Sequence, residues 1–128
     1  AAAEGVLAKT IEYVKDRKAF GQTIADFQNT KFKLAEAATE VRINRSFIEE
    51  CKDLFMKGEL DVTTASMAKF SVTEMQGRVT DTCLQLHGGY GYMREYGVSR
   101  AYVDARVQRI YGGTSEIMRE LISRDILA

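Results

Sequence analysis

The sequence predicts an all-α fold: an antiparallel up-down four-helix bundle with a short C-terminal helix. The 128 residues include no proline, so long helices can run without a break in their hydrogen-bond ladder. Apolar residues recur at helical spacing over long segments, and glycine stands at every break between them, as a bundle with short connections requires. A chain of this length fits one domain, residues 1–128.

The first two helices are predicted from their apolar stripes. One should run from Ala2 to about Ala19 and end at Phe20-Gly21-Gln22, because glycine adopts the left-handed conformation that terminates a helix at little cost. The second should start near Asp26 and continue to Lys57, a length of more than about 40 Å that needs long partner helices. The stripe of the first is Val6, Leu7, Ile11 and Val14, and that of the second is Phe32, Ala35, Ala38, Val41, Ile48, Cys51 and Phe55.

Three further helices are expected. Asp61 is a good N-cap for the third helix, which should stop at His87-Gly88-Gly89. Ser99 should cap a fourth helix that runs to about Tyr111, and Thr114 should cap a last short helix beyond a pair of glycines. The apolar stripe of the third helix consists of Val62, Ala65, Ala68, Val72, Met75, Val79 and Leu86.

The composition excludes several classes of protein. Eighteen basic residues balance eighteen acidic ones, so no net field favours nucleic acid or an anionic membrane. No apolar run approaches the roughly 20 residues of a membrane span, and the N-terminus lacks a basic-then-apolar signal layout. The opening Ala-Ala-Ala-Glu indicates a helix already under way, and hence a piece of a longer chain. Cys51 and Cys83 lie in helical patterns, which favours free buried thiols in a reducing compartment.

The sequence lacks two familiar motifs of functional sites. A di-metal bundle needs Glu-x-x-His pairs, but the single histidine, His87, has Leu84 three residues before it. Gly89-Tyr90-Gly91 follows a predicted helix rather than a strand, and it lacks the third glycine of a dinucleotide fingerprint. No metal site is therefore predicted.

Four clusters near the breaks remain as candidates for a site: residues 17–21, Gln28, residues 85–89 and residues 111–116. Each has an ordinary structural explanation as well. Arg17 and Lys18 near a helix C-terminus suit the helix dipole, and the glycine pairs can be plain helix stops. Thr114 can serve simply as an N-cap, and Gln28 can be an ordinary solvated residue. Individually, none of these clusters indicates a function.

Taken in order, the clusters resemble the C-terminal domain of the acyl-CoA dehydrogenase family. The resemblance covers essentially the whole chain and is closest to the long-chain and isovaleryl-type branches. It rests on Tyr-Val-Lys-x-Arg-Lys-Ala-Phe-Gly (Tyr13 to Gly21), Phe27-Gln28, Gln85-Leu86-His87-Gly88-Gly89-Tyr90-Gly91-Tyr92, Tyr102-Val-Asp-Ala-Arg106 and Ile110-Tyr-Gly-Gly-Thr-Ser-Glu-Ile. Several long blocks at matching spacing make the match specific.

The resemblance implies a helical bundle that follows an N-terminal helical domain and a middle β-domain, with FAD between them and across a subunit interface. Arg17 matches the family arginine that contacts the flavin pyrophosphate, a role that suits a guanidinium fork. Phe20 and Gln28 match positions near the same cofactor. In the family, a glycine-rich segment holds the ADP half of a flavin that is bound mainly by a neighbouring subunit. This segment corresponds to Gln85, Leu86, His87, Gly88 and Gly89. The segment beside the ribityl and ring end corresponds to Thr114, Ser115 and Glu116.

The resemblance also implies the substrate contacts, which correspond to Tyr111, Gly112, Gly113 and Arg124. Arg124 would meet the CoA portion, although it can also be a plain surface arginine. In the family, the backbone at Gly112 reaches the thioester carbonyl opposite a flavin ribityl hydroxyl and stabilises enolate-like charge, as an oxyanion hole does.

The catalytic base is expected outside this chain. Many family members carry it as a glutamate at the position of Gly112, and glycine cannot abstract a proton. The long-chain and isovaleryl-type members take it from the helix before the Arg-x-x-Phe-Gly motif, at a position that precedes residue 1. Glu4 lies more than two turns too late, so no side chain of this sequence is expected to act as the base.

The sequence thus predicts the C-terminal domain of an FAD-dependent acyl-CoA dehydrogenase of fatty acid β-oxidation, which helps to bind FAD and the acyl-CoA thioester. Its expected partners are the acyl-CoA, further copies of the chain in a dimer or tetramer, and electron-transfer flavoprotein or a similar acceptor. The expected location is the cytoplasm in a bacterium or the mitochondrial matrix in a eukaryote. The alternative is a stand-alone helical oligomerisation or interaction domain without flavin, but such a domain has no need of a pyrophosphate contact.

Overall fold

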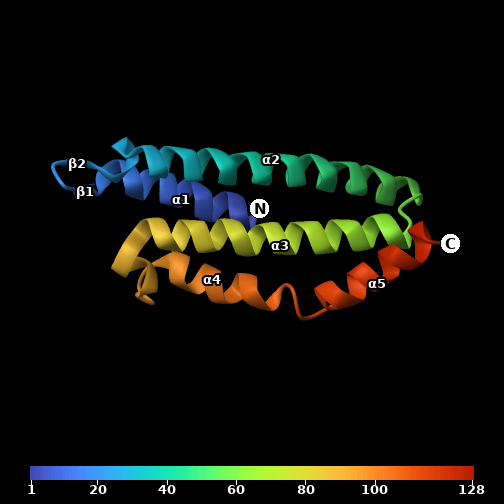
Figure 1. Ribbon diagram of the computed structural model, residues 1–128. Helices are drawn as coiled ribbons and strands as arrows, with labels where there is room; N and C mark the ends of the chain where they lie inside the picture. The colour runs from blue at the N-terminus through green and yellow to red at the C-terminus, as the bar shows by residue number, and fades with distance from the viewer.

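The computed structural model describes residues 1–128 and contains five α-helices and one short hairpin (Figure 1). The helices are α1 (Ala2–Asp16), α2 (Gln28–Lys57), α3 (Val62–His87), α4 (Gly97–Val107) and α5 (Ser115–Ile126). α1 and α3 run in one direction, whereas α2, α4 and α5 run in the other. The predicted all-α, up-down bundle with a short last helix is confirmed. None of the five helices combines the length and apolar character that a membrane span needs.

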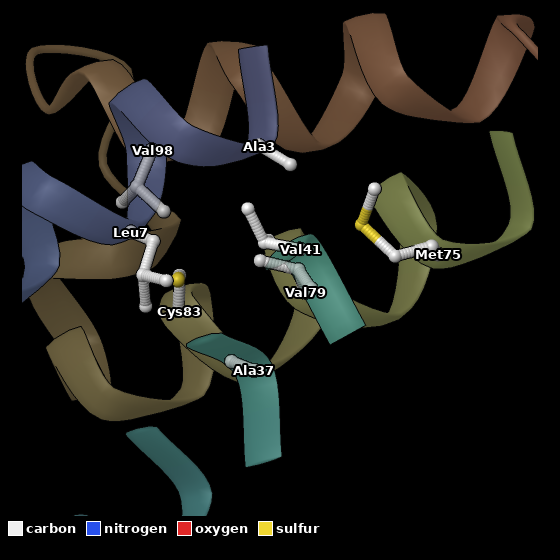
Figure 2. Close-up of a cluster of buried hydrophobic side chains, with 8 residues drawn as sticks. All are labelled: Ala3, Leu7, Ala37, Val41, Met75, Val79, Cys83 and Val98. Carbon is white, nitrogen blue, oxygen red and sulfur yellow. The ribbon is translucent and has the colours of Figure 1, made fainter. Parts of the chain in front are cut away.

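α3 is the central element of the bundle. It packs against each of the other four helices, and α4 and α5 lie end to end along it (Figure 1). Side chains of α1, α2, α3 and α4 meet in one core, which Figure 2 shows. The core residues are Ala3, Leu7, Ala37, Val41, Met75, Val79, Cys83 and Val98. Cys51 and Cys83 are free and buried, as predicted.

The first helix ends earlier than predicted, at Asp16 rather than about Ala19, because the backbone of Arg17 is already extended. The chain then forms a two-stranded antiparallel hairpin of β1 (Lys18–Ala19) and β2 (Gln22–Thr23). Its two turn residues, Phe20 and Gly21, both have positive φ, 53° and 80°. Two positive φ angles in a two-residue loop match the twist of the paired strands. Gly21 therefore belongs to a hairpin turn and not to a helix C-terminus.

The second helix begins at Gln28 rather than near Asp26. Residues Ile24–Asp26 form a short 3₁₀ turn, in which the Asp26 carboxylate accepts hydrogen bonds from the N–H of Thr23 at 3.0 Å and from its hydroxyl at 2.7 Å. This local side-chain pairing competes with helix formation and delays the helix.

The N-caps predicted for the third and last helices are confirmed, but the bounds of the fourth differ. Asp61 accepts a hydrogen bond from the N–H of Thr64 at 2.8 Å, and the Thr114 hydroxyl accepts one from the N–H of Ile117. α4 starts at Gly97, so Ser99 lies in its first turn and is not its cap. The earlier start buries Val98 against the core, and the helix ends at Val107, before Tyr111.

The predicted stripe of α2 is only partly buried. Val41 and Cys51 are buried, but Phe32 and Phe55 are 59% and 70% exposed. The residues that α2 buries are Thr30, Ala37, Val41, Asn44 and Cys51. In α3, Val62 is likewise exposed. Helical spacing alone does not distinguish two apolar faces of one helix, and the face that packs on α3 here carries polar residues as well.

We expect Met75→Ala to lower the free energy of unfolding by about 2–5 kcal/mol, because it leaves a cavity in a closed core. Met75 is 5% exposed, whereas Met56 of α2 is 82% exposed and serves as a matched control. Met56→Ala should change the free energy of unfolding by less than about 0.5 kcal/mol. Urea unfolding followed by circular dichroism, on dilute monomeric chain, measures both. Equal effects of the two substitutions would contradict this core.

Candidate cofactor and substrate site

Two of the predicted clusters meet at one end of the bundle. Arg17 follows α1, and residues 85–89 form the end of α3 and the start of the 3₁₀ turn Gly88–Tyr92. They line one open cavity of about 680 Å³, which we call the end pocket. Ala19, from the same predicted cluster as Arg17, also lines it, and so do four residues that the sequence did not assign to the site: Tyr13, Ile24, Tyr90 and Met93.

The Arg17 side chain brings an uncompensated positive charge to the end pocket. Its guanidinium carbon lies 5.2 Å from the centroid of the Tyr90 ring, a cation–π contact that orients it. It takes part in no ion pair within the chain. The carbonyl oxygen of Arg17 accepts a hydrogen bond from the N–H of Ile24 at 2.8 Å, which holds its backbone at the base of the hairpin. An exposed guanidinium without a counter-ion suits an anionic ligand.

An aromatic cluster forms one wall of the end pocket. The rings of His87 and Tyr13 stack with centroids 4.2 Å apart, and Tyr96 meets both edge-on. His87 Nδ1 lies 2.8 Å from the carbonyl oxygen of Cys83. Because a carbonyl only accepts, Nδ1 carries the hydrogen, and in that tautomer Nε2 is an acceptor. Burial raises the pKa of Tyr13, so its hydroxyl stays protonated and donates to the His87 carbonyl oxygen at 3.3 Å.

The glycines beside this wall leave the backbone open. Gly88 ends α3 with a φ of 59°. A Cβ on Gly88 or Gly89 would meet no atom within 4 Å, whereas one on Gly91 would strike the carbonyl oxygen of Leu84. Gly91 therefore serves packing, and Gly88 and Gly89 leave backbone that a ligand can approach closely.

Two predicted cofactor contacts lie outside the end pocket. Phe20, at the tip of the hairpin, is 95% exposed and meets only the edge of Phe27, with centroids 6.4 Å apart. Gln28 follows Phe27 directly and is exposed as the first residue of α2. A non-glycine residue at positive φ with its ring in solvent is strained. Phe20 is therefore a candidate contact for a group outside this chain.

A second site lies in the connection between α4 and α5, residues 108–114, which we call the glycine loop. Gly112 and Gly113 have φ angles of 62° and 98°. The N–H groups of Gly112, Gly113 and Thr114 donate to no acceptor in the chain. Three neighbouring free donors just before a helix N-terminus suit an anionic or partly negative oxygen.

Glu74 of α3 holds the start of α5 beside this loop. The Ser115 hydroxyl donates to Glu74 Oε1 at 2.7 Å, and Arg109 donates to Oε2 at 3.2 Å. The hydrogen bond from Ser115 and the Arg109 guanidinium lower the pKa of Glu74. Glu74 and Arg109 could not be recognised from sequence patterns, because their contacts join residues 35 and 41 positions apart.

The other predicted residues near the glycine loop are exposed. The Tyr111 hydroxyl donates to Gln108 at 2.6 Å, and Arg124 pairs with Glu120 at 2.8 Å. Glu116 lies in the first turn of α5. Only short-range contacts hold Tyr111 and Arg124, so both side chains are free to turn toward a ligand at small cost.

The end pocket and the glycine loop are separate sites on one helix. Glu74 and Gln85 are eleven residues apart on α3, which corresponds to roughly 16 Å at 1.5 Å per residue. No group of three His, Cys, Asp or Glu side chains is placed to hold a metal ion at either site. The end pocket offers a cation beside open backbone, and the glycine loop offers three neighbouring free N–H groups.

A family model described as acyl-CoA dehydrogenase, C-terminal domain, matches residues 1–127. The chain belongs to this family. The mitochondrial long-chain specific acyl-CoA dehydrogenase of Sus scrofa is 52% identical over 98% of the chain and 29% of its own length. A caffeyl-CoA reductase–Etf complex subunit of Acetobacterium woodii is 40% identical over 98% of the chain and 33% of its own length. The crystal structure of an acyl-CoA dehydrogenase from Geobacillus kaustophilus, 46% identical, matches with a TM-score of 0.95 over 98% of this chain and 33% of that one.

The chain thus spans about a third of the length of these acyl-CoA dehydrogenase relatives. The family resemblance predicted from the sequence motifs is confirmed, and so is the helical C-terminal domain that it implied. The relatives include enzymes named as a dehydrogenase and as a reductase. Membership of the acyl-CoA dehydrogenase family alone therefore does not determine the direction of the reaction.

We expect Glu74→Gln to make the stability of this acyl-CoA dehydrogenase domain less sensitive to acid. Folding lowers the pKa of Glu74, so the carboxylate stabilises the folded state above the pKa that glutamate has in the unfolded chain. This stability is lost as the pH falls through the lower pKa of the folded state. The wild-type chain should therefore lose more free energy of unfolding than the variant as the pH drops from about 5.

Urea titrations over a series of pH values measure this difference. Glu95→Gln is the matched control, because Glu95 is exposed and forms no ion pair in the chain, and its pH curve should follow that of the wild type. Parallel curves for the wild type and Glu74→Gln would show that the negative charge of Glu74 adds nothing to stability.

Proposed function

We propose that this chain is the C-terminal domain of an FAD-dependent acyl-CoA dehydrogenase, in which it helps to bind FAD and holds the acyl-CoA thioester for α,β-dehydrogenation. The observation that carries the proposal is the unpaired guanidinium of Arg17 in the same pocket as the open backbone of Gly88 and Gly89. A guanidinium binds phosphate oxygens through two parallel hydrogen bonds, and backbone without Cβ lets phosphates come close. These residues fit the pyrophosphate of FAD.

The polar atoms around this pair also fit the remainder of an adenine nucleotide. Gln85 is exposed at the pocket and offers an amide that both donates and accepts. With the hydrogen of His87 on Nδ1, its Nε2 is an acceptor that suits a ribose hydroxyl or an amino group better than a phosphate. The end pocket thus combines a phosphate contact with neutral contacts, as a dinucleotide requires.

The glycine loop is proposed to hold the thioester. Bound FAD would supply a hydride acceptor for the β-carbon of the acyl chain. The N–H groups of Gly112, Gly113 and Thr114, which are free in the chain, would donate to the thioester carbonyl oxygen as negative charge develops on it. One preorganised donor of this kind is worth about 2.7–4 kcal/mol of transition-state stabilisation. The same donors would serve reduction, because the thioester passes through the same charged state in both directions.

The base that removes the α-proton is proposed to come from outside this chain. Gly112 offers no proton acceptor, and Glu4 pairs with Arg45 of α2 at 3.1 Å. A Cβ on Gly112 would meet no atom within 4 Å. The loop therefore has room for the glutamate that other family members carry here, although the φ of 62° would strain it.

We further propose that copies of the chain form a dimer or tetramer in which two copies contact each flavin. Phe32 and Ile43 of α2 are 59% and 63% exposed and stand three turns apart on one face. An apolar face of this kind favours association with a second copy. Within one chain the end pocket and the glycine loop lie roughly 16 Å apart along α3, so a flavin that needs the two sites closer together would take them from two copies.

The acceptor of the electrons is proposed to be electron-transfer flavoprotein or a similar protein, and the location to be the mitochondrial matrix in a eukaryote or the cytoplasm in a bacterium. The names of the relatives support the acceptor and a mitochondrial location, since one relative is a mitochondrial enzyme and another is a subunit of an Etf complex. A stand-alone interaction domain without flavin would also use the apolar face of α2, but it would leave Arg17 without a role.

In the full-length protein, Arg17→Ala should weaken FAD binding by about tenfold or more, because a charge-assisted contact is worth roughly 1.5–3 kcal/mol. Arg17→Lys should lose less, since lysine keeps the charge but not the two-pronged contact. Lys18→Ala is the control: Lys18 is the next residue, is exposed and forms no ion pair. Fluorescence titration of the apoprotein with FAD gives the three affinities. If all variants bind FAD as the parent does, the flavin-free interaction domain is the better account.

The chain expressed alone should self-associate through α2, and Phe32→Glu or Ile43→Glu should shift it to monomer by placing a charge on the apolar face. Lys31→Glu adds the same carboxylate about 100° further round the helix and should leave association unchanged. Sedimentation velocity over a range of concentrations measures the distribution. A wild-type chain that remains monomeric at high concentration would rule out this face as a subunit contact.

A further inference from the structure

Two side chains of α3 reach across to the glycine loop and the start of α5. Lys69 Nζ donates to the carbonyl oxygen of Gly113, and Glu74 Oε1 accepts from the Ser115 hydroxyl at 2.7 Å. These contacts span 44 and 41 positions of the chain. Lys69 is half-buried and forms no ion pair, so the Gly113 carbonyl is its only polar partner in the chain.

The contact with Lys69 determines the direction of the Thr114 N–H, because the Gly113 carbonyl and this N–H belong to one planar peptide. The chain has no cis peptide bond, and a trans peptide directs its C=O and its N–H to opposite sides. Because the Gly113 carbonyl oxygen faces Nζ of Lys69, the N–H of Thr114 in the same peptide points away from this ammonium group. This N–H is one of the three free donors of the glycine loop.

Gly113 packs against α5, and the start of the loop is tied to the first residue of α5. A Cβ on Gly113 would lie 2.5 Å from Cε of Met118, and Met118 is itself 8% exposed. The N–H of Ser115 donates to the carbonyl oxygen of Arg109 at 3.1 Å, and the Arg109 side chain pairs with Glu74. The loop is thus held by α3 through side-chain contacts and by α5 through packing.

We propose that Lys69 and Glu74 are positioning residues for the thioester: they fix the glycine loop on α3 so that its free N–H groups meet a carbonyl oxygen that carries negative charge. This inference rests on the proposed function. Neither side chain touches the substrate, and both act through Gly113 and Ser115. An ammonium bound to the Gly113 carbonyl also polarises that peptide, which makes the Thr114 N–H a stronger donor.

The proposal predicts a selective defect, which two CoA ligands can separate in the full-length flavoprotein. A β-ketoacyl-CoA ionises to an enolate whose oxygen imitates the charged thioester. An S-alkyl-CoA of equal chain length has a thioether and no carbonyl oxygen. Lys69→Met should weaken binding of the β-ketoacyl-CoA by about tenfold to a hundredfold, as misplaced donors do, and leave the S-alkyl-CoA affinity unchanged.

Three further variants sharpen the test. Lys69→Arg keeps a donor and should recover part of the loss. Glu74→Gln should show the same selectivity with a smaller effect, because its amide oxygen still accepts from Ser115. Arg78→Met is the matched control: it breaks an ion pair of 2.7 Å from α3 to Glu40 on α2, away from the loop, and should change neither affinity.

Spectroscopic titration of the bound flavin measures each affinity. Unchanged β-ketoacyl-CoA binding in Lys69→Met, or an equal loss of both ligands, overturns the positioning role while the proposed function stands. If Lys69→Met does not fold, Glu74→Gln and Lys69→Arg decide by the same comparison. A wild-type protein that holds FAD but binds neither ligand refutes both the proposed function and this inference.

Discussion

The arrangement of the molecule depends on one constraint, which is that α3 is covered by four other helices at once. A helix packed on several faces cannot leave polar groups unsatisfied. The buried hydroxyls of Ser66, Thr73 and Thr80 each donate to the carbonyl oxygen four residues earlier, at 2.7, 2.9 and 2.6 Å. These bonds satisfy the hydroxyls within the helix. Neighbouring helices can therefore approach α3 closely without having to supply polar partners of their own.

The same helix also carries both candidate sites. Its C-terminal end supplies residues 85–89 to the end pocket, and its middle holds the glycine loop through Lys69 and Glu74. Sites built on a regular helix are held more precisely than sites built on loops alone. Because α3 is continuous, the distance between the two sites within one chain cannot change. A ligand that needs both sites close together must therefore take them from two copies, which is why the proposed function includes an oligomer.

Much of the candidate site could be named from the sequence, because its residues lie in short contiguous motifs. Arg17 and residues 85–89 were singled out together, and the structure shows that they line one pocket. Phe20 and Gln28 were grouped with them but lie outside that pocket, since the hairpin carries Phe20 away from it. Tyr13 and Glu74 were not assigned to the site. Nothing in their immediate sequence marks them, and their contacts to His87 and Ser115 arise only when helices pack.

The helical class, the positions of most breaks and the two caps at Asp61 and Thr114 could be predicted from the chain alone. These depend on interactions within a few residues: proline-free segments, glycine φ angles and side chains that bond three positions ahead. Which face of α2 is buried and where α4 begins depend instead on how the helices pack. The hydrogen bond from Lys69 to the carbonyl oxygen of Gly113 also depends on this packing. Burial and long-range hydrogen bonds depend on which helix lies opposite, and helical periodicity carries no information about that partner.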